Sequence, residues 1–228
     1  MDQATRDVII FPGTGSFGSE FQPIVRTLRP KAQVLRYPWR YGQADDMASS
    51  FHDAVMSCLP RLRGMQEKGP ILFGHSFGAY IAYALATALE KTACRIGGLI
   101  VVGANAPHVL DGAALLPRSP EEIEAYWAMV DPSLFERIPD PEWKDELIDT
   151  SCKELNLLSD FHAPDFGRLH CPIFAASGDR DPLVTKTGLD GWDEYTTEGV
   201  KSRRFSGGHT DLLATDEFIT WVKRITYH

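Results

Sequence analysis

Short apolar runs alternate along this chain with longer segments of helical periodicity, and this alternation is the strongest constraint on its fold. The expected strands are residues 8–11, 33–37, 71–73, 96–102, 173–177 and 201–205. The expected helices are residues 43–63, 76–90, 121–129, 143–158, 185–195 and 211–225. Strands that alternate with helices favour a mostly parallel sheet with helices on both faces. The predicted fold class is therefore α/β, with the nearly all-apolar run at residues 96–102 as a central strand.

The region between residues 105 and 165 breaks this rhythm. It holds no strong strand pattern, and several prolines divide it into two helical segments. We expect it to form a helical lid inserted above the sheet. The length of 228 residues suits one α/β domain, so we expect residues 1–228 to fold as a single unit that includes this lid.

The overall charge restricts the classes of partner. A formal net charge of −8 argues against a general nucleic-acid surface, which would need a basic face. Positive residues gather in the first quarter of the chain, where they form either a solvated rim or a docking patch: Arg26, Arg29, Lys31, Arg36 and Arg40. We therefore expect no nucleic-acid partner.

Cysteine usage and apolar run length point to a reducing, aqueous compartment. None of the four cysteines stands in a C-x-x-C pair, so no metal site is expected. The N-terminal residues lack the apolar stretch of a signal peptide, and the longest apolar runs fall short of the roughly 20 residues of a spanning helix. We expect a cytoplasmic monomer without membrane contact.

The sharpest chemical signal is the stretch Gly-His-Ser-Phe-Gly at residues 74–78, which matches G-x-S-x-G. It follows the expected strand at residues 71–73 and opens the Ala-rich helix at residues 76–90. In the α/β-hydrolase fold such a serine stands on a strained strand-to-helix turn, and the flanking glycines relieve crowding there. We therefore predict that Ser76 is a nucleophile rather than a structural serine, and that the fold is that of an α/β-hydrolase.

A nucleophilic serine needs a base and a carboxylate, which in this fold follow it in the order Ser, Asp or Glu, His. His209 lies after two glycines in a late strand-end loop and is the predicted base; His75 is expected to point elsewhere. The loop at residues 178–182 offers two carboxylates, Asp179 and Asp181. The G-x-x-D spacing favours Asp181 as the acid, with Asp179 as a turn residue.

Developing negative charge on the substrate needs two N–H donors. We predict the backbone N–H of Phe77, directly after the nucleophile, and that of Thr14, with Gly13 as the alternative. The glycines of this first loop, residues 13–18, also fit the dinucleotide pattern G-x-G-x-x-G. That reading is disfavoured because no acidic residue closes a second strand in the expected place.

With these residues placed, the chain resembles the type II thioesterases that accompany polyketide and nonribosomal peptide synthases. The resemblance covers most of the chain and rests on Phe11-Pro12 with its glycine-rich loop, Tyr37-Pro38 followed by Arg40, the serine motif, the acid loop at residues 178–184 with Gly191-Trp192 beyond it, and Gly207-Gly208-His209. The chain departs from the family at Trp39, where glycine is usual, and at Thr210, where an aromatic residue is usual. Residues 153–161 replace a Leu-Arg-Ala-Asp-Phe-like stretch.

The resemblance implies hydrolysis of acyl groups from the phosphopantetheine arms of acyl or peptidyl carrier proteins, in editing or product release. It implies a transient carrier partner and no cofactor of the enzyme's own. The lid would form the acyl pocket, and the side chains that either line it or simply pack the lid are Trp127, Met129, Phe135 and Trp143, with Leu134, Leu147 and Leu155.

Three alternatives remain open. A carboxylesterase acting on free oxyesters would share every catalytic residue. A release enzyme that cyclises its acyl chain would differ only in the nucleophile that replaces water. A non-catalytic binding relative would be expected to carry a damaged triad, whereas Ser76, His209 and Asp181 are all present.

Overall fold

Six strands, all paired in parallel, form the sheet in the part of the chain that the structure describes. The computed structural model describes residues 6–40, 48–62, 69–92, 94–110, 119–138, 140–162 and 166–227. The strands are β1 (Val8–Phe11), β2 (Ala32–Val34), β3 (Ile71–His75), β4 (Gly98–Val102), β5 (Ile173–Gly178) and β6 (Val200–Phe205). Their order is β2-β1-β3-β4-β5-β6. The predicted parallel α/β sheet is confirmed, with β4 inside the sheet and fully buried.

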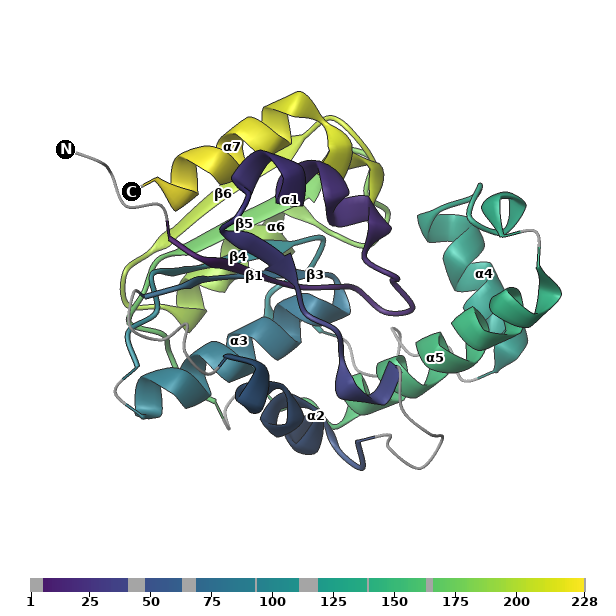
Figure 1. Cartoon of the computed structure of the whole chain (residues 1–228), viewed down its shortest axis with the longest axis horizontal. Helices are drawn as coiled ribbons and strands as arrows, with labels where there is room; N and C mark the ends of the chain where they lie inside the picture. Colours follow the sequence, from purple (N-terminus) through teal and green to yellow (C-terminus); the bar gives the residue numbers. More distant parts are fainter. Residues whose placement is uncertain are drawn as a thin grey trace.

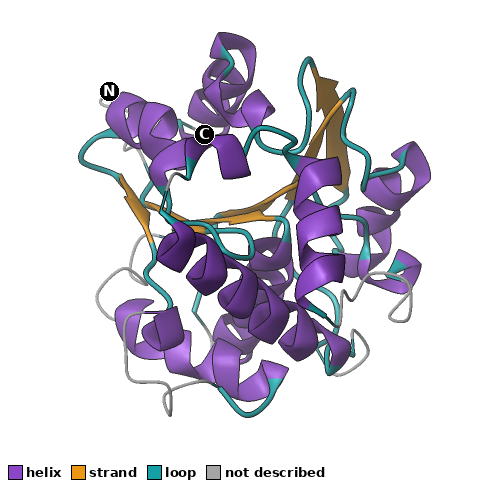
Figure 2. Ribbon diagram, turned by 90° about the vertical axis from the view of Figure 1, so that its right-hand side faces the viewer, coloured by secondary structure: helices purple, strands orange, loops and turns teal. Residues whose placement is uncertain are grey.

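Helices cover both faces of the sheet (Figures 1 and 2). On one face, α1 (Gln22–Leu28) and α7 (Asp216–Thr226) enclose an apolar cluster with Phe73. On the other lie α2 (Phe51–Cys58), α3 (Phe77–Lys91) and α6 (Lys186–Asp190). The alanines of α3 let its backbone approach the sheet closely, and nearly the whole helix is buried. Two buried layers therefore hold the carboxyl ends of β3, β5 and β6 in fixed places.

The lid helices, α4 (Pro120–Val130) and α5 (Pro141–Ser159), lie between β4 and β5 in the chain and project to one side of the sheet (Figure 1). Ser119 caps α4 in a reciprocal hydrogen-bonded capping box with Glu122, and Asp140 caps α5. The two helices share an apolar cluster of their own: Ile123, Trp127, Val130, Leu147, Ile148 and Leu155.

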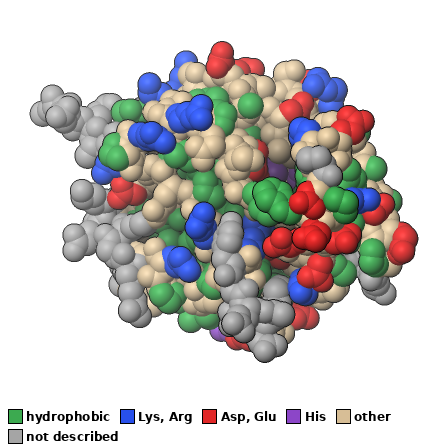
Figure 3. Space-filling model, turned by 45° about the vertical axis from the view of Figure 1, so that its right-hand side comes forward, with side chains coloured by type: hydrophobic (Ala, Val, Ile, Leu, Met, Phe, Trp, Pro, Cys, Tyr) green, Lys and Arg blue, Asp and Glu red, His purple; other side chains and the backbone are tan. Residues whose placement is uncertain are grey.

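The outer surface of the lid helices is acidic, as the group of red side chains in Figure 3 shows. Its exposed carboxylates are Glu121, Glu122, Glu142, Asp145, Glu146 and Asp149. Apart from the exposed Met129 and Trp143, the large apolar residues of the same helices turn inward, so the lid helices present mainly negative charge to solvent and apolar surface to the protein interior.

The boundaries of several elements differ from the sequence prediction. The second strand ends at Val34 because Leu35 and Tyr37 turn into the core beyond the sheet edge. The predicted helix at residues 43–63 is α2 and a short 3-10 helix, Leu59–Leu62; residues 43–47 and 63 lie outside the described residues. Short 3-10 segments also replace parts of the predicted helices at residues 185–195 and 211–225. Tertiary packing has shortened each regular helix at one end.

Among the helices that the structure describes, none is long and apolar enough to cross a membrane. In the same residues, no group of three or more His, Cys, Asp or Glu is placed to hold a metal ion.

Candidate active site

Ser76 stands at a strained backbone position between β3 and α3. Its φ of 52° and ψ of −123° lie outside the regions that residues with a side chain prefer. It is the one non-glycine residue with positive φ in the described part of the chain. Such a conformation costs about 1–3 kcal/mol and persists only when its surroundings fix it. Here the Ser76 N–H donates to the Val102 carbonyl at 2.8 Å, which anchors the turn to β4.

The two glycines of the serine motif are required by close backbone contacts. A Cβ on Gly74 would lie 2.4 Å from Ala79 Cα, and one on Gly78 would lie 2.1 Å from the Phe11 carbonyl oxygen. Both distances are far shorter than any real carbon contact. The motif therefore lets β3, β1 and α3 converge tightly beneath Ser76.

His209 and Asp181 form a buried hydrogen-bonded pair. The Nδ1 of His209 lies 2.8 Å from Oδ2 of Asp181, and the two residues are 2% and 7% exposed. Burial opposes ionisation of Asp181, but the hydrogen bond and charge of His209 and the Leu183 N–H outweigh it and lower the pKa of the carboxyl. The ionised carboxylate accepts from Nδ1–H, so Nε2 carries the lone pair of a base.

Asp179, the other candidate acid, has a structural place. Its Oδ1 accepts from the Gly207 N–H at 3.0 Å, and its side chain is half exposed beside Arg180. It therefore ties the acid loop to the histidine loop, as a turn residue would. The structure brings Asp181, and not Asp179, to His209.

Ser76 and His209 line one cavity of about 250 Å³, together with Thr14 of the first loop and Tyr126 and Trp127 of α4. In the described structure His209 Nε2 is buried without a hydrogen-bond partner. Catalytic hydrogen bonds are often long in a free enzyme, so this geometry is compatible with a serine–histidine pair that tightens on substrate binding.

Tyr126 is a residue of this site that the sequence did not single out. It lines the cavity of about 250 Å³ and also a second one of about 50 Å³ on the other side of Ser76, where Phe77 and Leu155 lie. Burial raises the pKa of the Tyr126 phenol to about 12, and a hydrogen bond with Ser76 acts in the opposite direction. Tyr126 therefore brings a neutral hydroxyl from α4 to the nucleophile.

The predicted oxyanion donors flank Ser76. Phe77 is the first residue of α3, where backbone N–H groups have no partner within the helix. Thr14 is 2% exposed and lines the Ser76 cavity from the opposite side. In the part of the chain that the structure describes, the Thr14 N–H has no hydrogen-bond acceptor. That these two N–H groups bind an oxyanion stays a prediction.

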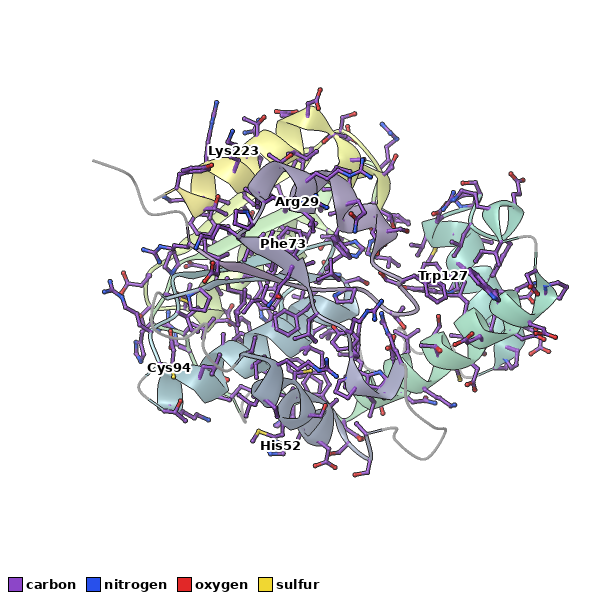
Figure 4. All side chains as sticks on the ribbon, in the orientation of Figure 1. Arg29, His52, Phe73, Cys94, Trp127 and Lys223 are labelled. Atoms are coloured by element: carbon purple, nitrogen blue, oxygen red, sulfur yellow. The ribbon has the colours of Figure 1, made fainter. Side chains whose placement is uncertain are left out.

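The lid residues predicted to line an acyl pocket divide into two sets. Trp127 does line the Ser76 cavity and projects from α4 toward the first loop, where a Cβ on Gly15 would lie 3.3 Å from its ring (Figure 4). Leu134 and Leu147 line the same cavity, and Leu155 lines the smaller one.

Met129, Phe135 and Trp143, in contrast, line neither Ser76 cavity as the described residues define them, so their role in an acyl pocket stays a prediction. Met129 is 50% exposed, on the side of α4 turned away from Trp127. Trp143 is 59% exposed, and its ring lies 6.2 Å from that of Phe17 at the surface. Phe135 packs against the lid cluster under the ammonium group of Lys144.

The sequence left open whether the basic residues of the first quarter form a solvated rim or a docking patch, and in the structure they do not all lie at the surface. Arg26, Arg29 and Arg36 are exposed, and Figure 4 shows Arg29 on the α1 side, away from the lid helices. Lys31 pairs with Asp7 at 3.2 Å. Arg40, in contrast, has a side chain only 7% exposed and forms a buried ion pair with Glu154 of α5. It is therefore an internal residue.

Comparison with known proteins supplies the family. Residues 6–226 match the model of the thioesterase domain. The chain belongs to this family. The sequence resemblance to thioesterases is thereby confirmed, on a match that includes Ser76, Asp181 and His209.

The chain is also similar to curated thioesterases and to part of a synthase. A probable cadicidin biosynthesis thioesterase of Streptomyces griseus is 24% identical, covering 89% of this chain and 57% of the relative. Thioesterase PikA5 of Streptomyces venezuelae is 28% identical, covering 89% of this chain and 74% of that protein. Phenyloxazoline synthase MbtB of Mycobacterium tuberculosis is 24% identical, and the match spans 89% of this chain but 15% of the synthase. The chain thus spans little more than half of the cadicidin relative and a small part of the synthase, but about three quarters of PikA5.

Solved structures of thioesterases share the fold. RedJ, from prodiginine biosynthesis in Streptomyces coelicolor, superposes with a TM-score of 0.82 at 22% identity, covering 96% of this chain and 90% of RedJ. The type II thioesterase BorB of the borrelidin cluster gives 0.80 at 25% identity, covering 98% and 93%. YbtT, the type II thioesterase of yersiniabactin biosynthesis, gives 0.82 at 18% identity, covering 99% and 94%.

Proposed function

We propose that this thioesterase-family protein hydrolyses acyl thioesters carried on the phosphopantetheine arm of an acyl or peptidyl carrier protein. The observation that carries the proposal is the buried His209–Asp181 pair, which shares one cavity with a serine held at positive φ. The combined nonribosomal peptide and polyketide pathways named for YbtT and for ClbQ, a further structural neighbour, favour a role in polyketide or nonribosomal peptide synthesis.

In the proposed reaction each residue of the site has a defined role. His209 Nε2 takes the proton of Ser76 as its oxygen attacks the thioester carbonyl, and Asp181 stabilises the imidazolium that forms. The N–H groups of Phe77 and Thr14 bind the oxyanion. The thiol leaves with a proton from His209, and the same nitrogen then activates water to break the acyl-serine ester.

The lid helices would determine which acyl chains enter. Trp127, Leu134 and Leu147 give the larger cavity an apolar wall beside Ser76. The lid helices must move apart from the first loop to admit a chain longer than this cavity holds, as lids do in other enzymes. We further propose a cytoplasmic monomer that needs no cofactor and meets its carrier transiently.

Intact mass spectrometry of an acyl-loaded carrier protein tests this function. We expect the wild-type protein to remove the acyl mass and the Ser76→Ala variant to leave it in place. A p-nitrophenyl ester of the same chain serves as the control substrate. If the protein cleaves that oxyester but removes the acyl group from none of several loaded carriers, the result would favour a carboxylesterase instead. A product lighter than the free acid by one water would indicate cyclisation.

A further inference from the structure

Glu154 of α5 carries a carboxylate that the proposed catalytic cycle does not use, yet it is fully buried. Burying an ionised carboxylate is costly unless hydrogen bonds and an opposite charge compensate it. Glu154 has both. The guanidinium of Arg40 meets it in a two-pronged contact, with Nε 2.6 Å from Oε1 and Nη2 2.8 Å from Oε2. Such a complete set of partners fixes the carboxylate in one position.

The remaining donors to Glu154 come from the segments around the first loop. Its Oε2 accepts from the Thr14 hydroxyl at 3.0 Å and from the Gly15 N–H at 2.9 Å. Its Oε1 accepts from the indole N–H of Trp39 at 2.9 Å. One carboxylate of a lid helix therefore holds the loop that follows β1 and the segment that follows β2.

Arg40 also forms hydrogen bonds with the backbone of the first loop. Its Nη2 donates to the Gly13 carbonyl at 2.7 Å, and its Nη1 donates to the Ser16 carbonyl. The Ser16 N–H in turn donates to the Gly13 carbonyl at 3.3 Å. Between residues 14 and 16, the N–H groups of Gly15 and Ser16 are thus engaged within the described structure, whereas that of Thr14 is not.

From these contacts we infer that Glu154 is a positioning residue for the oxyanion hole, which it sets by fixing the Thr14 peptide in the orientation that turns its N–H toward Ser76. The inference rests on the proposed function. Because the carboxylate belongs to α5, the same contacts make the orientation of the Thr14 N–H depend on the position of this lid helix. A movement of α5 that breaks the Glu154 contacts releases the Thr14 peptide, so catalysis is completed only with the lid helix in this place.

The test compares binding of an oxyanion mimic with binding of a neutral ligand. A trifluoromethyl ketone forms a tetrahedral adduct with a catalytic serine, whereas the methyl ketone of the same chain binds without that charge. For Glu154→Gln we expect kcat on p-nitrophenyl acetate to fall about 10- to 100-fold with KM little changed, since a complete oxyanion donor is worth about 10²–10³ in kcat. Affinity for the trifluoromethyl ketone should fall by a similar factor, and affinity for the methyl ketone should not change.

Glu146→Gln is the matched control, because it makes the same charge change on an exposed turn of the same helix. It should retain the wild-type kcat and the wild-type affinities for both ketones.

Glu154→Gln leaves the Arg40 guanidinium buried without its counter-charge, which can prevent folding, so a second and milder variant is needed. Thr14→Val removes the hydroxyl, with its contact of 3.0 Å to Glu154 and its longer contact of 3.5 Å to the Ser151 carbonyl, and keeps the ion pair. It should lower kcat and trifluoromethyl ketone affinity about fivefold, in keeping with one hydrogen bond.

The inference is overturned if a folded Glu154→Gln protein keeps wild-type kcat, or if both ketones lose affinity equally. Should Glu154→Gln not fold, Thr14→Val decides by the same two criteria. Failure of the proposed function has a different signature. In that case the wild-type protein cleaves p-nitrophenyl acetate but leaves the acyl-carrier intact, and the ketone comparison still reports on Glu154.

Discussion

The ring of His75, the residue before the nucleophile, contacts the backbone carbonyl of His209 through its Nε2 at 2.9 Å. A carbonyl only accepts, so Nε2 carries the proton and Nδ1 is bare. The two imidazole rings lie 4.9 Å apart. His75 therefore ties the histidine loop to the serine turn, while Asp181 pairs with His209 and not with His75.

Two substitutions of His75 distinguish the role of this hydrogen bond from that of the imidazole ring. His75→Gln keeps an N–H donor near the His209 carbonyl and should retain kcat within about threefold. His75→Leu leaves that buried carbonyl unsatisfied, which costs about 1–3 kcal/mol, and should lower kcat at least about tenfold. Steady-state hydrolysis of a p-nitrophenyl ester measures both. Equal activity of the two variants would show that the hydrogen bond does not position the base.

Stability should fall as the solution is acidified below pH 6.5, because of His75. Burial, and then the nearby charge of His209, lower the pKa of His75 to about 3, against about 6.5 in an unfolded chain. Between these two pH values His75 is protonated in the unfolded chain but neutral in the folded protein. The contribution of neutral His75 to the free energy of unfolding is therefore complete above about pH 6.5 and is lost at about 1.4 kcal/mol per pH unit below it.

Urea unfolding of the wild type and of His75→Gln at pH 7, 6, 5 and 4.5 measures this dependence. The variant should show a flatter profile, since it has lost the titrating group. Asp181 does not disturb this comparison. Because its pKa is lowered in the folded protein, the contribution of ionised Asp181 to stability is complete above about pH 3.9 and is lost only below that value, outside the measured range of pH 4.5 to 7. Parallel profiles for the two proteins would mean that His75 is not the group responsible.

Gly78→Ala should abolish folding, because its Cβ would overlap the Phe11 carbonyl at 2.1 Å and neither backbone can yield. Gly167→Ala is the matched control: it also adds one methyl group, at a site with φ 89° and no atom within 4 Å. Gly167→Ala should lower the free energy of unfolding by about 1–2 kcal/mol, because alanine is disfavoured in the left-handed backbone conformation. Thermal unfolding followed by circular dichroism distinguishes them, and a stable Gly78→Ala protein would contradict the tight serine turn.

Substitutions on the two sides of the lid helices should affect acyl-chain preference differently. Leu147 lines the Ser76 cavity, so Leu147→Phe should shorten the longest p-nitrophenyl ester that is cleaved efficiently. Trp143 is mostly exposed, so Trp143→Ala should leave the chain-length profile unchanged. The profile from two to twelve carbons reports both variants. A profile altered by Trp143→Ala alone would place the acyl path along the outer surface.

Sequence reasoning located Ser76, Asp181 and His209 because parallel strands bring their carboxyl ends to one edge of the sheet. Chain order and motif spacing were therefore sufficient to bring those three residues together. Glu154 offered no such signal, since its partners lie 114 to 140 residues away in the chain. Its burial depends on how α5 packs, which composition does not reveal.

The lid helices show a second limit. Apolar residues on α4 and α5 satisfy helical periodicity whether they face the cavity, the partner helix or the solvent. Trp127 and Met129 are two residues apart on α4, yet one lines the Ser76 cavity and the other is 50% exposed. Tyr126, with its polar hydroxyl, was overlooked although it lies beside the nucleophile.

Covalent capture of the acyl group on Ser76 tests the central claim most directly. The protein is mixed with an acyl-loaded carrier, quenched in acid at times from milliseconds to minutes, and digested for peptide mass spectrometry. The account predicts an acyl mass on the peptide that contains Ser76, which rises and then decays as free carrier thiol accumulates, and which is absent in Ser76→Ala. Full release of carrier thiol by the Ser76→Ala variant, or an acyl group found on a different residue, would contradict it.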